Sequence, residues 1–296
     1  MKKRSIVIIV VAASAVIVLC FVGLIVVIGL TEGGDYQFEG FGSKVAVVEL
    51  YGQIYDSKSF VRQMNKWDNN SAVKAIVIDI NSPGGGVAAS QEMYDAILKV
   101  REGGKLVVAS MSSVAASGGY YVACAADKIV ANPGTLTGSI GVILSFPTAK
   151  KLFDKIGVRW ETVKSGDLKA VGSYSRPMSA EEERMLKAVV DDSYEQFVEA
   201  VSEGRDRPKE EIYPLADGSI FTGRQAYNLG LVDTLGSFQD AVSLAGEMVG
   251  LGSDPDTIKE RRKSPGLFDV LSGGLKVAEK ITDLELGQPG LLYLYQ

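Results

Sequence analysis

A serine followed by two glycines, Ser117-Gly118-Gly119, lies in a chain of 296 residues that contains no histidine. A serine hydroxyl is a weak nucleophile at neutral pH unless a neighbouring base takes its proton. Without histidine a Ser-His-Asp triad cannot form, and the remaining common base for a hydrolytic serine is a lysine held neutral. The composition therefore leaves a Ser-Lys pair as the prominent candidate for nucleophilic chemistry.

The neighbours of Ser117 suit a nucleophile. Val114-Ala115-Ala116 precede it and glycines follow it, so a substrate backbone could approach closely. If Ser117 begins a helix, the N–H of Gly118 can point at the negative oxygen that develops on a substrate, and Gly84 can supply a second N–H. Alternatively, Ser117 only caps the helix, a role that needs no chemistry. The residues alone leave both interpretations open.

A glycine-rich segment, Ser82-Pro83-Gly84-Gly85-Gly86, falls between a predicted strand and a predicted helix. Open α/β sheets bind ligands at such junctions, and consecutive glycines let backbone N–H groups turn toward a bound group. A phosphate loop is one interpretation, although the segment lacks the lysine-threonine pair of such loops. One wall of an oxyanion hole and a simple tight turn are the other two.

Lys169 is the candidate base. A lysine in water has a pKa of about 10.4 and is charged, so a lysine that accepts a proton must be buried away from water and from carboxylates. Leu168 and Ala170 flank Lys169 and would allow such burial. Lys164 is the local rival, and Asp167 would keep Lys169 charged if it reached the ammonium.

The elements that must position these residues alternate between strands and helices. Mostly apolar runs at 44–50, 73–80 and 106–111 predict strands, and the segments between them, 57–67 and 87–100, predict helices. Strands joined through a helix and a short return run parallel. The sequence therefore predicts an α/β fold.

The second half of the chain continues this alternation. It predicts a short strand at 129–131 and helices at 148–155 and 239–249. The longest soluble helix follows Ser179, which forms a capping box with Glu182. The acidic run at 181–183 suits the dipole of a solvated first turn, and we do not interpret it as a metal site.

The N-terminus predicts a membrane anchor. Lys2-Lys3-Arg4 precede an uncharged run of 27 residues, 5–31, made mostly of Ile, Val, Leu, Ala and Gly. As a helix it would span ~40 Å, enough to cross a hydrocarbon core of ~30 Å, and it exceeds the ~7–15 apolar residues of a cleaved signal. We predict a cytoplasmic stub at 1–4, a transmembrane helix at 5–31, a stalk at 32–43 and an extracytoplasmic domain.

Composition limits what the rest of the chain can be. Residues 44–250 predict one main domain, and 251–296 a C-terminal tail that ends in the apolar Leu291-Leu292-Tyr293-Leu294-Tyr295. The net charge of −5 and the pI of about 5.1 argue against nucleic acid as a partner. Cys20 in the anchor cannot pair with Cys124 in the domain, so no disulfide is expected. No motif for a metal or a nucleotide occurs, and we expect no cofactor.

Five motifs occur in a fixed order. They are Ser82-Pro83-Gly84-Gly85, Ala116-Ser117-Gly118-Gly119-Tyr120-Tyr121, Leu136-Thr137-Gly138-Ser139-Ile140-Gly141, Gly166-Asp167-Leu168-Lys169 and Phe221-Thr222-Gly223-Arg224-Gln225-Ala226. Together they resemble the signal peptide peptidase A family, membrane-anchored bacterial serine proteases related in fold to the Clp protease subunit and the crotonases. The resemblance covers about residues 45–249, and the length is similar to that of the short Gram-positive form.

The resemblance implies a fold of repeated ββα units, a ring of identical subunits and a set of site residues. It implies that Ser117 is the nucleophile and Lys169 the general base. The N–H groups of Gly84 and Gly118 would form the oxyanion hole, and Ser139 would hydrogen-bond the lysine and orient it. No metal or cofactor takes part in the implied chemistry.

The activity implied by the resemblance is hydrolysis of peptide bonds in signal peptides left in the membrane after secretory processing. Two other classes of function stay open. One is a noncatalytic crotonase-like scaffold that binds peptides at the membrane, in which Ser117 and Lys169 are only structural. The other is an acyl-CoA enzyme on the same fold, which suits an extracytoplasmic location poorly because coenzyme A is cytosolic.

Overall fold

The structure is a computed structural model that describes residues 42–260 and 292–294. The predicted cytoplasmic stub, the apolar run at 5–31 and nearly all of the predicted stalk lie outside the described residues, as do residues 261–291 of the predicted tail. Among the described residues, no helix has the length and the apolar character needed to cross a membrane.

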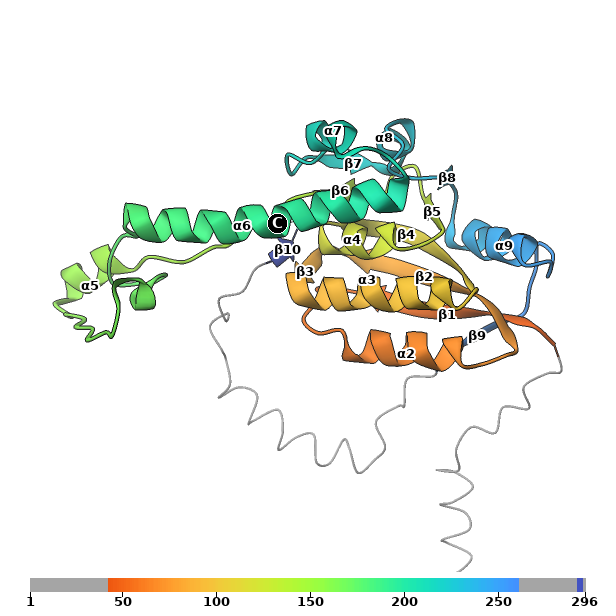
Figure 1. The fold of residues 1–296 in the computed structure, drawn as a ribbon, viewed down its shortest axis with the longest axis horizontal. Coiled ribbons are helices and arrows are strands. Elements are labelled where there is room, and N and C mark those ends of the chain that lie inside the picture. The colour runs from red at the N-terminus through yellow and green to blue at the C-terminus, as the bar shows by residue number, and fades with distance from the viewer. Residues whose placement is uncertain (1–41, 261–291, 295–296) are drawn as a thin grey trace, which may run out of the picture. The chain divides into compact units, whose positions relative to one another are not determined.

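The described strands and helices alternate along the chain (Figure 1). The strands are β1 Lys44–Tyr51, β2 Val73–Ser82, β3 Gly84–Gly86, β4 Leu106–Ala116, β5 Lys128–Ala131, β6 Leu136–Gly138, β7 Ile220–Thr222, β8 Thr234–Leu235, β9 Thr257–Lys259 and β10 Leu292–Leu294. The α-helices are α2 Lys58–Asp68, α3 Val87–Glu102, α4 Gly118–Cys124, α5 Lys150–Ile156, α6 Ala180–Arg205, α7 Lys209–Ile212, α8 Gly223–Asn228 and α9 Phe238–Met248; the 3-10 helices are η1 Asp167–Ala170 and η2 Tyr213–Leu215.

A mainly parallel sheet forms the centre of the domain. Its strand order is β7-β6-β4-β2-β1-β9, and β5 joins beside β4 and pairs in turn with β8. β1, β2 and β4 run parallel, with Val45 opposite Ala75 and Ala75 opposite Leu106. β7 runs antiparallel to β6, so the sheet is mixed. The α/β class predicted from the sequence is confirmed.

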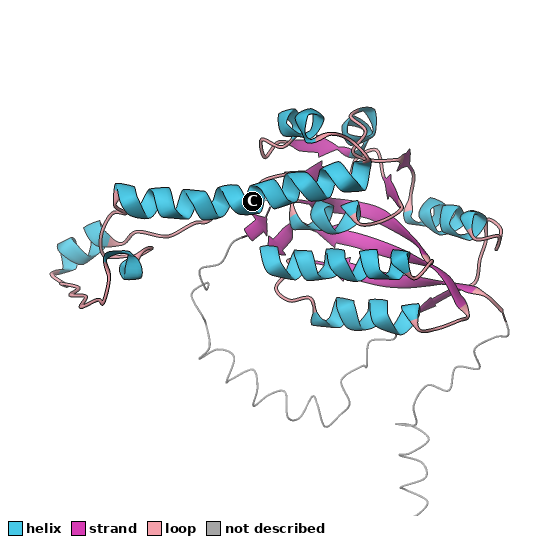
Figure 2. Ribbon diagram, viewed as in Figure 1, coloured by secondary structure: helices cyan, strands magenta, loops and turns pink. Residues whose placement is uncertain are grey.

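Alternate side chains of the central strands enter two hydrophobic clusters on opposite faces of the sheet. Ile76 and Ile78 of β2 join the larger cluster, with residues of α2, α3 and α4 (Figure 2), whereas Ala75 and Val77 join a smaller cluster with α9. Because strand side chains alternate between faces, a strand covered on both faces is apolar at successive positions. This explains the continuous apolar runs in the sequence.

The predicted elements correspond to observed ones, with one difference at the C-terminal boundary. The predicted helices at 57–67, 87–100 and 239–249 correspond to α2, α3 and α9. The predicted tail begins at 251, but β9, within that tail, pairs in parallel with the edge of β1. The sheet therefore includes residues beyond the predicted domain boundary, and such a short strand has too few residues to show a periodic pattern.

Between β6 and α6 the chain forms an arm, which we define as residues 149–178 and which contains α5 and η1. The Ala149 N–H donates to the Tyr174 carbonyl oxygen at 2.8 Å and closes the base of the arm. The predicted capping box is present where α6 begins, because the Glu182 N–H donates to Ser179 Oγ and the Glu182 carboxylate accepts the Ser179 N–H. Figure 1 shows α5 beside the N-terminal end of α6, away from the sheet.

Candidate active site

Ser117 lies at the sharp turn between β4 and α4. Its backbone has φ 52° and ψ −119°, a positive φ that residues other than glycine rarely adopt. The Ser117 N–H donates to the Gly138 carbonyl oxygen, and the Ser117 carbonyl oxygen accepts the Tyr121 N–H, both at 2.8 Å. These two hydrogen bonds hold the serine in its strained conformation.

The hydroxyl of Ser117 is not used by the helix that follows. The residue is 1% exposed, and its Oγ has no hydrogen-bond partner among the described residues. A capping serine would accept a backbone N–H from the first turn of α4, and Ser117 accepts none. The capping interpretation therefore fails. A buried hydroxyl without a partner costs about 1–3 kcal/mol, and groups kept in this state call for an explanation by function.

β3, the glycine-rich strand, runs beside this turn. The Gly84 carbonyl oxygen accepts the Ile54 N–H, and the Gly86 N–H donates to the Ile54 carbonyl oxygen, both at 2.8 Å. A Cβ at Gly85 would lie 2.1 Å from the Ile54 carbonyl oxygen, so only glycine fits there. The other edge of β3 pairs with β10 in antiparallel register, with Tyr293 opposite Gly85. β3 thus has one edge that accepts an extended chain.

The two glycines that begin α4 let this helix pack directly on the glycine-rich segment. A Cβ at Gly118 would lie 2.6 Å from Ser90 Oγ and 3.2 Å from the Gly85 nitrogen. A Cβ at Gly119 would lie 2.8 Å from the Ser82 carbonyl oxygen. The Ser-Gly-Gly sequence therefore brings the start of α4 next to the backbone of β3, and β10 contacts α4 as well.

In the structure the Gly84 N–H has a hydrogen-bond partner within its own segment. The N–H donates to Ser82 Oγ at 3.1 Å, and both groups are buried. We predicted this N–H as an oxyanion donor, whereas here Ser82 holds it; the Gly85 N–H is the adjacent alternative. Serine hydroxyls often accept a backbone N–H two residues later, so the Ser82-Pro83-Gly84 sequence carried a signal for this bond.

Lys169 lies on the arm, where it is exposed on η1. The carboxylate of Asp167 pairs with the Lys164 ammonium at 3.7 Å. It is therefore engaged by the rival lysine and not by Lys169. The Lys164 ammonium also donates to the Asp167 carbonyl oxygen at 2.6 Å. The rival lysine and the acidic residue therefore engage each other and leave Lys169 facing solvent in this chain.

Arg176 fastens η1 to the start of α6. Its guanidinium donates to the Ala170 carbonyl oxygen at 3.2 Å and to both carboxylate oxygens of Glu182, which is 2% exposed. The hydrogen bonds from Arg176, aided by the Ser179 N–H, lower the pKa of Glu182 to about 2. Glu182 is therefore ionised at neutral pH, and this ion pair keeps Lys169 at the N-terminal end of α6.

α6 separates Lys169 from Ser117 within one chain. Glu182 lies in the first turn of α6, and Phe197 of α6 contacts Tyr121 of α4 with 5.1 Å between ring centroids. The interval from 182 to 197 spans roughly 22 Å of helix at 1.5 Å per residue, farther than a lysine side chain reaches. One chain thus brings together Ser117, β3 and β10, but not Lys169.

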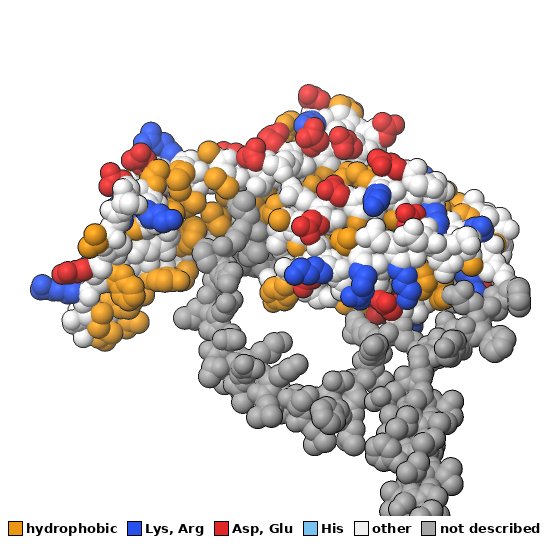
Figure 3. Space-filling model, turned by 60° about the horizontal axis from the view of Figure 1, so that its bottom comes forward, with side chains coloured by type: hydrophobic (Ala, Val, Ile, Leu, Met, Phe, Trp, Pro, Cys, Tyr) orange, Lys and Arg blue, Asp and Glu red, His pale blue; other side chains and the backbone are white. Residues whose placement is uncertain are grey.

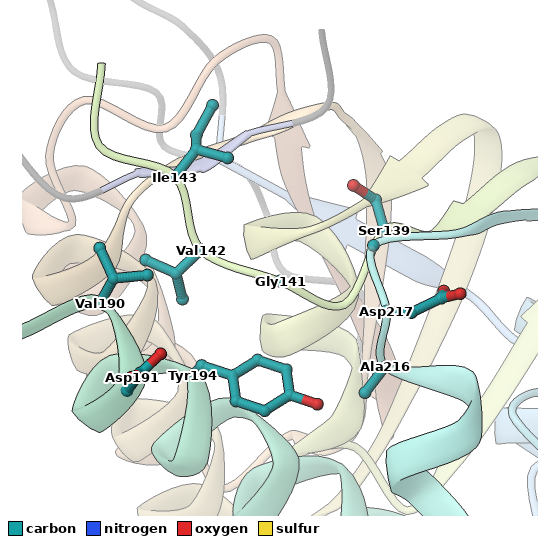
Figure 4. Close-up of a pocket in the computed structure, with 10 residues that line it drawn as sticks. Ser139, Gly141, Val142, Ile143, Val190, Asp191, Tyr194, Ala216 and Asp217 are labelled. Carbon is teal, nitrogen blue, oxygen red and sulfur yellow. The ribbon is translucent and has the colours of Figure 1, made fainter. Parts of the chain in front are cut away.

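Ser139 lines a hollow of about 660 Å³ between residues 139–143 and α6. It has a positive φ of 50°, and its N–H donates to the Ser219 carbonyl oxygen at 2.7 Å. Figure 4 shows Ser139 on one side of this hollow, with Val190 and Tyr194 of α6 on the other. The hollow is open to solvent.

Other groups near α4 do not compete with Ser117 as nucleophiles. Burial raises the pKa of the Cys124 thiol to about 12, so the thiol stays protonated at neutral pH and is inert. In residues 42–260 and 292–294, no group of three or more Cys, Asp or Glu side chains is placed to hold a metal ion. The buried hydroxyl of Ser117 is therefore the candidate nucleophile of the site.

Two family models match this chain. The model of peptidase family S49 matches residues 99–252, and the model of the Clp protease matches residues 41–135. The first range contains both Ser117 and Lys169, and the second contains β3 together with Ser117. Both matches therefore fall on the segments that build the site.

Relatives from three organisms share sequence with most of the chain. A Synechocystis protein, named provisionally as a protease, is 42% identical over 81% of this chain and 87% of its own length. An Enterococcus faecium protein, named provisionally as the signal peptide peptidase SppA, is 38% identical over 76% of this chain and 65% of its own length. The chloroplastic serine protease SPPA of Arabidopsis thaliana is 37% identical over 83% of this chain. The match spans only 37% of that plant protein.

Proposed function

The chain belongs to peptidase family S49, whose members are serine proteases, and we propose that it is a membrane-anchored endopeptidase that degrades signal peptides left in the membrane after secretory processing. The pairing of β10 with β3 beside α4 carries this proposal. It supports a site that binds an extended peptide by adding a strand to β3. The name of the Enterococcus relative supports the substrate class.

In the proposed reaction a neutral Lys169 takes the proton of the Ser117 hydroxyl while Ser117 Oγ bonds to the substrate carbonyl carbon. The negative oxygen of the tetrahedral intermediate accepts hydrogen bonds from Gly118 and from the glycine-rich segment. The Lys169 ammonium then gives its proton to the leaving amine, and the acyl-enzyme forms. Water activated by the same lysine releases the acyl peptide and restores the serine.

In this proposal Lys169 comes from a neighbouring copy of the chain. Three observations support it: the separation of Lys169 from Ser117 along α6, the partnerless Ser117 Oγ, and the exposed apolar side chains of the arm. Leu152, Ile156 and Trp160 are each more than half exposed, and Figure 3 shows hydrophobic side chains gathered along the arm. Exposed apolar surface of this kind marks interaction sites.

A contact in which each copy gives its arm to the next is head-to-tail, and a head-to-tail contact closes into a ring when the rotation permits. Such a ring is the proposed homo-oligomer. The arm of one copy would place Lys169 near the hollow that Ser139 lines in its neighbour, so that Ser139 could orient the lysine. A ring would also exclude folded proteins by size, while unfolded apolar segments could enter.

The membrane anchor is proposed from the apolar run at 5–31, which lies outside the described residues. A helix there would hold the domain on the extracytoplasmic side, because the basic residues 2–4 favour the cytoplasm. The fold of repeated ββα units is likewise proposed, supported by the mixed sheet and by the match to the Clp protease model.

The C-terminal tail is proposed to be an internal substrate of the same site. β10 occupies the edge of β3 that a peptide substrate would need, and residues 291–295 are apolar and uncharged. Intact-mass measurements on the unmodified chain and on Ser117→Ala test this idea after long incubation. Shortening of the unmodified chain alone supports it, whereas an intact C-terminus in both removes it.

The experiment that tests the proposed function compares the full chain in detergent with its Ser117→Ala and Lys169→Ala variants. Each is incubated with a synthetic signal peptide, and the fragments are weighed by mass spectrometry. Cleavage by the unmodified chain alone supports a Ser-Lys peptidase. Cleavage by none of three folded proteins would favour the noncatalytic scaffold. Cleavage retained by Lys169→Ala would require another base, with Lys164 tested next.

A further inference from the structure

Ser82 is a buried residue that has no part in the proposed proton transfers or bond changes. It ends β2, is fully buried, and accepts the Gly84 N–H on its Oγ at 3.1 Å. Gly84 has a φ of +98°, a conformation that suits glycine alone. Ser82 also lies directly against α4, because a Cβ at Gly119 would be 3.5 Å from Ser82 Cβ. The hydrogen bond therefore lies in the wall of the site.

The geometry of β3 decides which way its peptide groups face. Successive residues of a strand direct their N–H and C=O groups to opposite edges. The Gly84 carbonyl and the Gly86 N–H both bond to Ile54, so the N–H of Gly85 faces the opposite edge, where β10 pairs. A Cβ at Gly118 would be 3.2 Å from the Gly85 nitrogen. The Gly85 amide thus faces the β10 edge and adjoins the start of α4, as the Gly84 Cα also does.

We propose that Ser82 is a positioning residue. By holding the Gly84 N–H, its hydroxyl keeps the Gly85 N–H turned toward Ser117, where the Gly85 and Gly118 N–H groups together form the oxyanion hole. Glycine has no side chain to restrict its backbone. The Ser82 hydroxyl holds the peptide group before Gly84 and the Ile54 N–H holds the peptide group after it, so the two hydrogen bonds together fix the backbone angles of Gly84. The inference rests on the proposed function, because an oxyanion forms only if Ser117 attacks a carbonyl.

The expected effect falls on the transition state and not on substrate binding. Removal of an oxyanion donor lowers kcat by about 10²–10³-fold. In Ser82→Ala the Gly85 N–H is still present but is less firmly oriented, so kcat should fall by less than it does when a donor is removed. We expect Ser82→Ala to lower kcat by roughly 10- to 100-fold. KM should change by less than about twofold, because the lost interaction is made only with the transition state.

The test measures kcat and KM with an internally quenched signal peptide and the full chain in detergent. Ser90→Ala is the matched control: Ser90 is fully buried, and its Oγ donates to the Gly86 carbonyl oxygen at 3.0 Å. This variant removes a hydrogen bond to the same glycine strand without touching the Gly84 N–H. We expect its kcat to stay within about threefold of the unmodified value, since one neutral hydrogen bond contributes modestly.

Several outcomes would overturn the inference. An equal loss of kcat in Ser82→Ala and Ser90→Ala would show general loosening of the strand. An unchanged kcat in Ser82→Ala, or a raised KM alone, would remove the positioning role while leaving the protease intact. An unmodified chain that cleaves nothing would instead overturn the proposed function, and the role of Ser82 with it.

A peptide aldehyde gives a second measurement that does not depend on turnover, because it forms a tetrahedral adduct with the nucleophilic serine. The aldehyde should bind Ser82→Ala more weakly than the unmodified chain, so that its inhibition constant rises by about the same factor as kcat falls. Affinity for an uncleaved peptide, measured in Ser117→Ala with and without Ser82→Ala, should not change. If Ser82→Ala fails to fold, Ser82→Cys replaces it, since sulfur is only a weak acceptor. Full kcat in Ser82→Cys would contradict the proposal.

Discussion

Two inactive variants should restore activity when they share one assembly. If Lys169 serves the Ser117 of a neighbouring copy, a Ser117→Ala chain still contributes its lysine and a Lys169→Ala chain still contributes its serine. In an evenly mixed ring, half of the copies keep the serine and half of their neighbours keep the lysine. About one quarter of the sites are then complete. If both residues act within one chain, no site is complete at any ratio.

The assay co-expresses the two variants with different affinity tags and purifies the mixed assemblies through both tags in turn. Activity should rise and fall with the fraction x of one variant as x(1 − x), with its maximum in the even mixture at about one quarter of unmodified activity. Ser117→Ala mixed with the double variant Ser117→Ala/Lys169→Ala is the control and should stay inactive. Absence of activity in verified mixtures of folded chains would refute the inference that α6 keeps the two residues apart.

The base, the packing of α4 and the ion pair at the start of α6 can each be tested separately. Activity should rise toward alkaline pH because the base must be neutral, and Lys169→Arg should be inactive since guanidinium does not deprotonate; a flat pH profile would count against a lysine base. Gly119→Ala should destabilise the fold by about 1–3 kcal/mol in urea unfolding, because its Cβ would lie 2.8 Å from a buried carbonyl oxygen, whereas Gly134→Ala, with open space around it, should be nearly neutral. Arg176 lowers the pKa of Glu182 to about 2 in the folded protein, whereas the ordinary carboxyl pKa is about 4.3. The ionised Glu182 should therefore stabilise the fold fully above a pH of about 4.3, and this stabilisation should be lost as the pH falls toward 2. Glu182→Gln should therefore melt at a lower temperature than the unmodified chain at neutral pH. If the difference between the two melting temperatures does not become smaller on acidification, the stabilising role of the ionised Glu182 is contradicted.

The sheet and its covering helices could be predicted because their signals are local. β2 is apolar on both faces, since α9 covers one face and α2 to α4 cover the other. The capping box of Ser179 and Glu182 is a pattern of four residues. β9 and β10 are three residues long and form by pairing with β1 and β3, far away in the sequence, so no local pattern could reveal them.

The candidate site could be predicted in chemistry but not in geometry. The absence of histidine and the glycines after Ser117 indicated a serine that needs an unusual base. The interval between Ser117 and Lys169 in the sequence carries no information about distance, because the arm holds the lysine at the far end of α6. The hydrogen bond from the Gly84 N–H to Ser82 is local, but its effect on Gly85 appears only when β3 is paired with Ile54 on one edge.

In the proposed reaction Ser117 is the nucleophile and Lys169 activates it. The most direct measurement treats the full chain in detergent with a peptide β-lactone, which leaves an ester on a nucleophilic serine, and locates the ester by mass spectrometry after digestion. We predict an ester on Ser117 that is lost in Lys169→Ala. An ester on Ser139 or Ser82 instead, or labelling of Ser117 that does not depend on Lys169, would contradict the claim.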